Sequence, residues 1–222
     1  MIDEQWRILL YPLGFLSALA FGARFLVQWA QSEWQGRSIV TPLFWQISLL
    51  GNLLLVVHSI FQLQVHICLI QGCNTVIAWR NLNLLQQKRP PVSFFAVISV
   101  MIASTLLILT IFALHGDISW FRIPIAPWQS SPAAQVSLSW HLIGFFGTAL
   151  FSLRFWVQWW EAERAHKSQL TTTFWWLSII GALIALAYAL RIQDSVNLIG
   201  PLLGLVPYIR NLMLIKKAPQ RL

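Results

Sequence analysis

The chain contains one ten-residue pattern twice, at an offset of 130 residues. Residues 24–33 and 154–163 share the frame Arg-Phe-x-Val-Gln-Trp-x-x-x-Glu, and each comes late in a long apolar run. The same offset aligns 14–84 with 144–214 without a gap, and the identities include many polar and aromatic positions. Self-similarity of this kind indicates a duplicated structural unit, so any fold must accommodate two related halves.

Apolar stretches dominate both halves. Only 10% of the residues are charged, against roughly 25% in soluble domains, and the mean hydropathy is +0.65. Several runs approach the ~20 apolar residues that cross a bilayer as a helix. We therefore expect an all-α, polytopic membrane protein with seven transmembrane helices. The expected spans are 8–30, 43–61, 65–85, 92–114, 138–160, 174–190 and 196–215.

The duplication groups these spans as three, one and three. We expect a first three-helix repeat at 8–85, a linker helix at 92–114 and a second repeat at 138–215. Three helices are an odd number, so a directly following copy would be inverted in the membrane. One extra crossing restores the orientation and makes the two repeats parallel.

The distribution of positive charge predicts the orientation, because lysine and arginine collect on the cytoplasmic side. An external N-terminus and a cytoplasmic C-terminus put eight cations inside and three outside. The inner set is Arg37, Lys88, Arg89, Arg164, Lys167, Lys216, Lys217 and Arg221, and the outer set is Arg7, Arg122 and Arg191. This asymmetry explains the net charge of +8 without a nucleic-acid partner.

An arginine and a glutamine four residues apart recur in the two patterns: Arg24 with Gln28, and Arg154 with Gln158. Such pairs share one helix face. An arginine inside a membrane helix is costly and usually faces protein or water. One interpretation is a group that binds an anion or a sugar in a cleft between helices. The other is an arginine that extends to the lipid headgroups or pairs with a nearby glutamate.

The third helix of each repeat ends on a second cation: Arg80-Asn81 in one and Arg210-Asn211 in the other. These residues either anchor the helix end or contribute to the same ligand site. A further hypothesis joins Glu33 to Arg80 and Glu163 to Arg210, so that each acid ties the first helix to the third within its own repeat. Tryptophans near the same ends are typical of the membrane interface, with sugar stacking as the alternative. They are Trp29, Trp45, Trp159 and Trp175.

Four residues of the first repeat are polar at mid-membrane depth where the second repeat has none of the same kind. Asn52, Gln71, Asn74 and Thr75 stand opposite Ala182, Pro201, Gly204 and Leu205 of the second. A cavity between the repeats would therefore be asymmetric. No catalytic set, metal site or cofactor motif is evident, because the five histidines are scattered and no paired carboxylates fall at mid-membrane depth. Independent enzymatic activity is not expected.

The repeated pattern, followed by Ser38, Pro42, Phe44-Trp45, Ser48, Gly51 and Arg-Asn-Leu, resembles the lipid A biosynthesis N-terminal domain family. The resemblance covers 13–85 and 143–215, and the second copy departs from it at Ala162, His166 and Thr172. That family is a three-helix membrane module, found alone or fused ahead of the lipid-A-disaccharide synthase glycosyltransferase. More distantly, the 3+1+3 layout is similar to the SWEET and PQ-loop transporters.

The resemblance implies a multi-pass protein of the bacterial inner membrane that takes part in lipid A biosynthesis. Its expected role is to bind or position an anionic acylated sugar lipid, a lipid A precursor, at the cytoplasmic leaflet beside a synthase catalytic subunit. The alternatives are a SWEET-like facilitator of a small solute and a purely structural anchor. The candidate ligand residues are Arg24, Gln28, Trp29, Arg80, Asn81, Arg154, Gln158, Trp159, Arg210 and Asn211, with Glu33 and Glu163 as structural partners.

Overall fold

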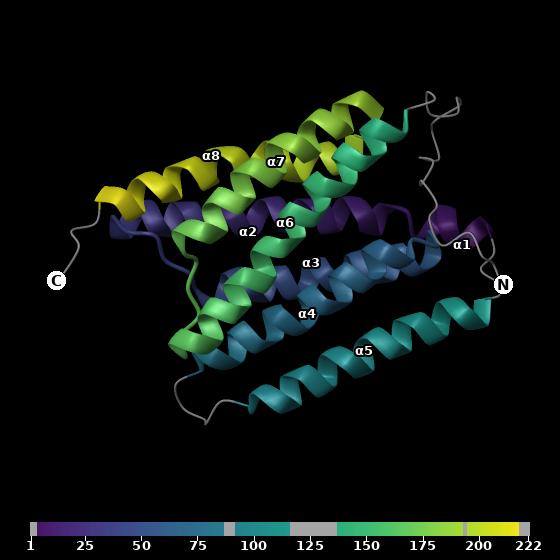
Figure 1. The fold of residues 1–222 in the computed structure, drawn as a ribbon, viewed down its shortest axis with the longest axis horizontal. Helices are drawn as coiled ribbons and strands as arrows, with labels where there is room; N and C mark the ends of the chain where they lie inside the picture. The colour runs from purple at the N-terminus through teal and green to yellow at the C-terminus, as the bar shows by residue number, and fades with distance from the viewer. Residues whose placement is uncertain (1–3, 87–91, 116–136, 193–194, 218–222) are drawn as a thin grey trace.

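The computed structural model of the protein describes residues 4–86, 92–115, 137–192 and 195–217, which are almost entirely helical (Figure 1). The helices are α1 (Glu4–Leu9), α2 (Pro12–Gln35), α3 (Pro42–Phe61), α4 (Val65–Leu85), α5 (Phe94–His115), α6 (Leu138–Ala165), α7 (Thr172–Ile192) and α8 (Ser195–Lys217). Each of the seven expected spans coincides with one long helix, from α2 to α8.

Six of the long helices pack as a closed ring. The order around the ring is α2, α3, α4, α6, α7, α8. Each helix contacts the next one, and α8 contacts α2. Helix α5 lies outside the ring along α4, at the lower edge of Figure 1. The segments that the sequence comparison aligns, α2–α4 and α6–α8, therefore meet at two places. We call these places the α2/α8 junction and the α4/α6 junction.

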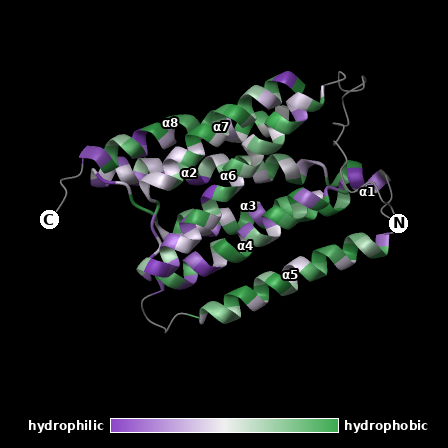
Figure 2. Ribbon diagram, viewed as in Figure 1, coloured by the Kyte–Doolittle hydropathy of each residue, from purple (hydrophilic) through white to green (hydrophobic). Residues whose placement is uncertain are grey.

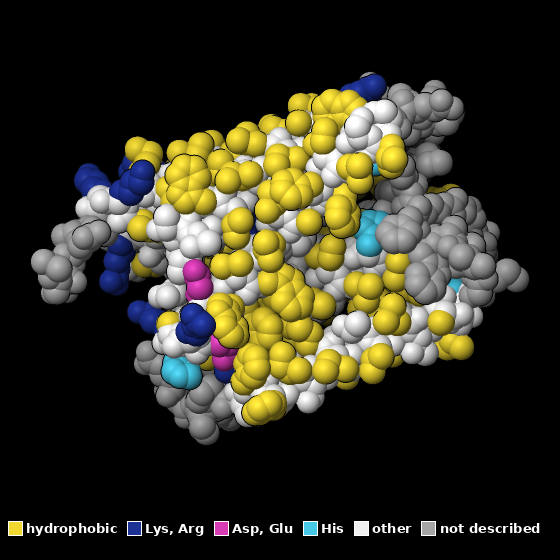
Figure 3. Space-filling view, in the orientation of Figure 1, with side chains coloured by type: hydrophobic (Ala, Val, Ile, Leu, Met, Phe, Trp, Pro, Cys, Tyr) yellow, Lys and Arg dark blue, Asp and Glu magenta, His cyan; other side chains and the backbone are white. Residues whose placement is uncertain are grey.

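Within the described residues, five helical segments are long and apolar enough to cross a membrane: Gln5–Gln35, Pro42–Phe61, Phe94–His115, Thr172–Ile192 and Leu198–Lys217. Helices α4 and α6 are long enough but more polar, so seven crossings remain a prediction. Hydrophobic residues predominate along the middle of the helices (Figure 2). In the space-filling view, hydrophobic side chains cover the middle of the visible face, and the lysines and arginines lie at its ends (Figure 3). An apolar surface of this extent is expected where lipid surrounds a protein.

The repeated pattern does not end its helix, contrary to the expected ends at 30 and 160. Helix α2 continues to Gln35 and α6 continues to Ala165. Each helix then ends at a residue in the left-handed conformation, Gly36 with φ 63° and His166 with φ 48°. The glutamines of the pattern, Gln28 and Gln158, do not end the helices, because they find hydrogen-bond partners inside the protein.

The core of the ring is aromatic and combines both segments. Phe25 packs edge-on against Tyr208 with ring centres 4.8 Å apart, and it also contacts Trp175 at 6.3 Å. Trp45 contacts Phe155 at 6.4 Å. Trp45 and Trp175 are 1% and 0% exposed, so the expectation that they lie at the membrane interface was wrong. Their large rings instead fill the space between the two segments.

Candidate functional site

The α2/α8 junction is held by a glutamine–asparagine pair and an ion pair. Gln28 Nε2 donates to Asn211 Oδ1 at 2.8 Å, and Asn211 Nδ2 donates back to Gln28 Oε1 at 2.9 Å. One turn further along α2, Glu33 accepts two hydrogen bonds from the Arg210 guanidinium, one of them 2.9 Å from NH2 to Oε2. Trp29 Nε1 also donates to Glu33 Oε1, at 2.9 Å.

The α4/α6 junction repeats this arrangement with the equivalent residues. Gln158 Nε2 donates to Asn81 Oδ1 at 2.8 Å, and Asn81 Nδ2 donates to Gln158 Oε1 at 3.1 Å. The Arg80 guanidinium donates to both oxygens of Glu163, at 2.6 and 2.7 Å. Trp159 Nε1 completes the set with a 2.8 Å hydrogen bond to Glu163 Oε1.

Both acids therefore pair with an arginine of the other segment. The hypothesis of pairs within each repeat, Glu33 with Arg80 and Glu163 with Arg210, was wrong in its choice of partner. The reason lies in the ring, which places α2 against α8 and α4 against α6. The same chemistry that was expected to hold each repeat together instead joins the two segments.

The two ion pairs differ in burial. The Arg80 and Glu163 side chains are 4% and 11% exposed, whereas those of Arg210 and Glu33 are 39% and 34% exposed. The residues just before α5 cover the Arg80–Glu163 ion pair and not the Arg210–Glu33 pair. Arg80 NH1 donates to the Val92 carbonyl at 2.6 Å. A buried pair is costly to break, and an exposed pair stabilises only weakly.

Arg24 lies near the middle of α2 and points into the ring. Its side chain is 4% exposed, and its NH1 donates to Ser48 Oγ at 2.9 Å. The guanidinium carbon lies 4.6 Å from the Phe21 ring centre and 4.8 Å from that of Phe25. The interpretation that this arginine extends to the headgroups or pairs with Glu33 was therefore wrong.

Arg154 is the equivalent arginine of α6 and is completely buried. It is 0% exposed, and none of its three guanidinium nitrogens has a hydrogen-bond partner among the described residues. Its guanidinium carbon lies 3.5 Å from the Phe151 ring centre and 5.4 Å from that of Tyr208. The buried Tyr208 hydroxyl likewise has no partner within the described residues.

The two arginines share the same aromatic cage. Arg24 lies over the Phe155 ring at 4.9 Å, and Arg154 lies over the Phe25 ring at 5.1 Å. Within the described ranges, neither guanidinium has a carboxylate partner, because Glu33 and Glu163 are bound to Arg210 and Arg80. We call Arg24 and Arg154 the arginine pair. Aromatic faces attract the cations, but two buried charges still lack a counterion.

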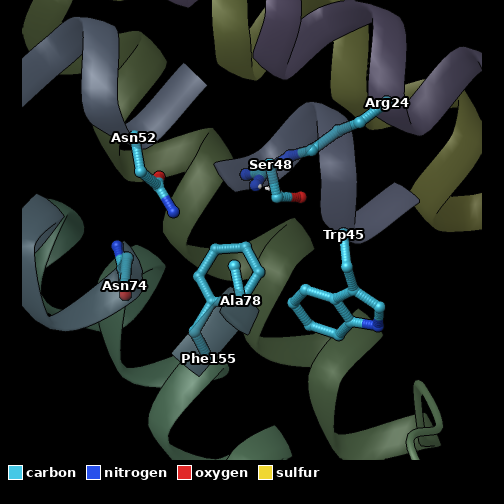
Figure 4. A pocket seen from close by; sticks show the side chains of 7 residues that line it. All are labelled: Arg24, Trp45, Ser48, Asn52, Asn74, Ala78 and Phe155. Atoms are coloured by element: carbon cyan, nitrogen blue, oxygen red, sulfur yellow. Dashed lines mark hydrogen bonds between the residues drawn. The ribbon is translucent and has the colours of Figure 1, made fainter. Parts of the chain in front are cut away.

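A narrow gap lies beside Arg24 and has no room for a water molecule in this structure. Asn52 and Asn74 face each other across it in Figure 4. Asn74 is 7% exposed, and its Oδ1 atom has no hydrogen-bond partner in the described part of the chain. The lining is Arg24, Trp45, Ser48, Asn52, Asn74, Ala78 and Phe155.

The structure separates the predicted ligand residues into two kinds. The glutamines, asparagines and tryptophans, with Arg80 and Arg210, bind each other at the junctions, and their ligand role remains a prediction. Among these predicted ligand residues, only the arginine pair has buried donors without a partner in the described part of the chain. The aromatic cage was not predicted from the sequence, although Phe25 and Phe155 follow the two arginines directly in the repeated pattern. Their aromatic character was visible, but which rings would face a neighbouring helix was not.

Comparison with known proteins gives a consistent assignment. The profile of the lipid A biosynthesis N-terminal domain matches twice, at residues 13–83 and 143–213, together well over half of the chain. The lipid-A-disaccharide synthase of Chlamydia pneumoniae is 37% identical over 98% of this chain and 35% of its own length. The synthase of Chlamydia trachomatis serovar D is 35% identical over 96% of this chain and 35% of its own length.

The chain thus spans about a third of the length of the curated relatives it matches. No solved structure matches it significantly. The double match to one profile places both three-helix segments in one family. The chain belongs to the lipid A biosynthesis N-terminal domain family.

Proposed function

We propose that this protein takes part in lipid A biosynthesis and binds an anionic acylated sugar lipid inside its ring of helices. The relatives named lipid-A-disaccharide synthase support the pathway, since they match nearly the whole chain. The chain corresponds to about a third of the length of those proteins. Its proposed role is to hold or position a lipid A precursor for a synthase catalytic subunit. That subunit is the proposed protein partner.

The proposal that a ligand binds here rests mainly on the arginine pair. Two buried guanidiniums without a carboxylate partner among the described residues call for an anion, because a buried unpaired charge is unstable. Phosphate suits arginine, whose planar fork of donors can bind two oxygens at once. A phosphorylated headgroup would also use the nitrogens of Arg154 that have no hydrogen bond in this structure.

We place the junction ends of the helices at the cytoplasmic face of the bacterial inner membrane. Among the described cations, five lie at or just after the helix ends that carry the junctions: Arg37, Arg164, Lys167, Lys216 and Lys217. Figure 3 shows a group of lysine and arginine side chains at the left of the visible face. Arg7 and Arg191 belong to the opposite end. Lys88, Arg89, Arg122 and Arg221 lie outside the described residues. Thiol labelling of Lys216→Cys from the cytoplasmic side only is expected, and labelling from outside would reverse this orientation.

This placement gives seven crossings in a 3+1+3 arrangement. Helices α4 and α6 cross despite their polarity, because Arg80, Asn81, Gln158 and Glu163 satisfy each other at the α4/α6 junction. Polar groups inside a bilayer are tolerated when they face protein and have partners. The domain boundaries expected from the sequence are part of the same proposal.

A SWEET-like facilitator of a small solute is the second candidate. The closed ring of six helices favours it, since a charged centre surrounded by helices also suits a transport path. The two candidates differ in what the purified protein carries. A lipid-binding protein keeps its ligand through purification, whereas a facilitator releases a weakly bound solute.

Native mass spectrometry of the purified protein tests the proposal. We expect the wild-type chain to retain a phosphorylated acylated sugar lipid, and Arg154→Gln to lower the retained fraction at least about tenfold, the effect of losing a charged hydrogen bond. Arg37→Gln is the matched control, because Arg37 is exposed outside the ring. Wild-type protein without such a lipid, together with solute uptake into proteoliposomes, would favour the facilitator instead.

A further inference from the structure

We infer that the two segments build one ligand site, not two, with the phosphate at the arginine pair and the sugar on the first segment. This inference rests on the proposed function and adds the number of ligands and the groups that recognise the sugar. The sugar-recognising side chains are Asn52 of α3 and Asn74 of α4, which face each other in Figure 4.

Some residues around the gap have an identical counterpart 130 positions away. Arg24, Trp45 and Ser48 correspond to Arg154, Trp175 and Ser178, and Phe155 corresponds to Phe25. These residues form the shared framework of aromatic rings and guanidiniums. By themselves they would make two equivalent sites.

The remaining three lining residues differ in every case. Asn52, Asn74 and Ala78 of the first segment correspond to Ala182, Gly204 and Tyr208 of the second. The second segment therefore lacks both amides. The second segment also has the large ring of Tyr208 where the first has the methyl group of Ala78.

Tyr208 fills the space in the second segment that the Asn74 side chain has in the first. A Cβ atom added at Gly204 would lie 2.3 Å from the Tyr208 hydroxyl oxygen. Tyr208 itself is 0% exposed and packs against Phe25. A side chain at position 204 would require the buried Tyr208 ring to move, so the equivalent of the gap is closed in this structure. Among the described residues, the second segment therefore lacks beside Arg154 the narrow gap that the first segment has beside Arg24.

The side chains that line the gap of the first segment are suited to binding a sugar. A carboxamide has both donors and acceptors, so two facing carboxamides can bind hydroxyl or amide groups of a glucosamine ring. The Oδ1 atom of Asn74 is buried and has no partner among the described residues. An acceptor left without a hydrogen bond in the interior is costly, and a ligand donor would satisfy it.

The position of the gap suits a lipid. Asn74 and Ala78 lie on α4 and Phe155 lies on α6, so the gap adjoins the α4/α6 junction. In Figure 1, α6 crosses α4 near their junction ends and diverges from it toward the other end. A headgroup can enter by separating these helices while its acyl chains stay in the bilayer.

Binding to protein in phosphatidylcholine nanodiscs tests this inference. Two probes are titrated: a monophosphorylated diacylglucosamine, and phosphatidic acid, which has a phosphate but no sugar. We expect one sugar lipid per chain. Asn52→Ala and Asn74→Ala should each weaken its binding about fivefold or more, as expected for a lost hydrogen bond, and leave phosphatidic acid binding unchanged. Arg154→Gln should weaken both.

Gln46→Ala is the control, since Gln46 is an exposed polar residue of the same helix, α3. Ala78→Tyr, which copies the second segment, should abolish binding of the sugar lipid by filling the gap. Two sugar lipids per chain, or asparagine variants that bind both probes as the wild type does, would overturn the single asymmetric site. Wild-type protein that binds neither probe would instead refute the proposed function.

Discussion

Gly36 and His166 occupy equivalent positions after α2 and α6, and both have left-handed backbone angles. Glycine adopts this conformation freely, whereas a residue with a side chain is strained there by about 1 kcal/mol. The second segment thus carries a small strain that the first avoids. The open space around the Gly36 Cβ position shows that backbone conformation, and not crowding, is the relevant factor at that site.

This difference predicts opposite effects of two substitutions. His166→Gly should raise the free energy of unfolding by up to about 1 kcal/mol, and Gly36→Ala should lower it by about 1 kcal/mol. Denaturant unfolding in detergent, followed by tryptophan fluorescence, measures both. Equal effects of the same sign would contradict the assigned helix ends. The sequence showed that the second copy has His166 where the first has Gly36. It did not show that this residue adopts the left-handed conformation.

At the scale of helices, the two junctions have the same hydrogen bonds in different surroundings. Glu163→Gln should destabilise the protein by about 2 to 3 kcal/mol, because it leaves Arg80 buried without its counterion. Glu33→Gln should cost clearly less, since its ion pair with Arg210 is open to solvent. Thermal unfolding of the two variants provides a matched comparison.

A double-mutant cycle then identifies the partners. Coupling is expected between Glu163 and Arg80 and not between Glu163 and Arg210. Coupling of Glu163 to Arg210 and not to Arg80 would instead support ion pairs within each repeat. The sequence could not distinguish these options, because both segments carry the same acids and arginines at the same positions. Only the packing of α4 against α6 and of α2 against α8 decides between them.

The helices themselves were largely predictable, since apolar runs of sufficient length have few alternatives. All seven long helices occur where they were expected. Their ends were less predictable: the pattern residues Gln28 and Gln158 looked like the polar end of a span, yet both are 0% exposed inside the ring. Polarity marks the end of a membrane helix only when the side chain has no partner within the protein.

At the scale of the whole molecule, the ring encloses the arginine pair between its two segments. The junction acids neutralise the outer arginines, Arg80 and Arg210, and leave Arg24 and Arg154 without a carboxylate among the described residues. Sequence analysis identified both arginines, because charge in an apolar helix is conspicuous. It could not show that the nearby acids would be taken by other cations. We propose that the arginine pair binds a ligand and is not needed to hold the fold together.

The most direct test is the unfolding of lipid-free Arg24→Met/Arg154→Met in detergent. Methionine fills similar space without charge, and replacing buried charges by apolar groups is often neutral or stabilising by about 1 to 4 kcal/mol. We predict that the double variant unfolds at the same temperature as the lipid-free wild type or higher, while it no longer retains the phosphorylated lipid. A large fall in the unfolding temperature would show that the arginine pair holds the helices together and would contradict this account.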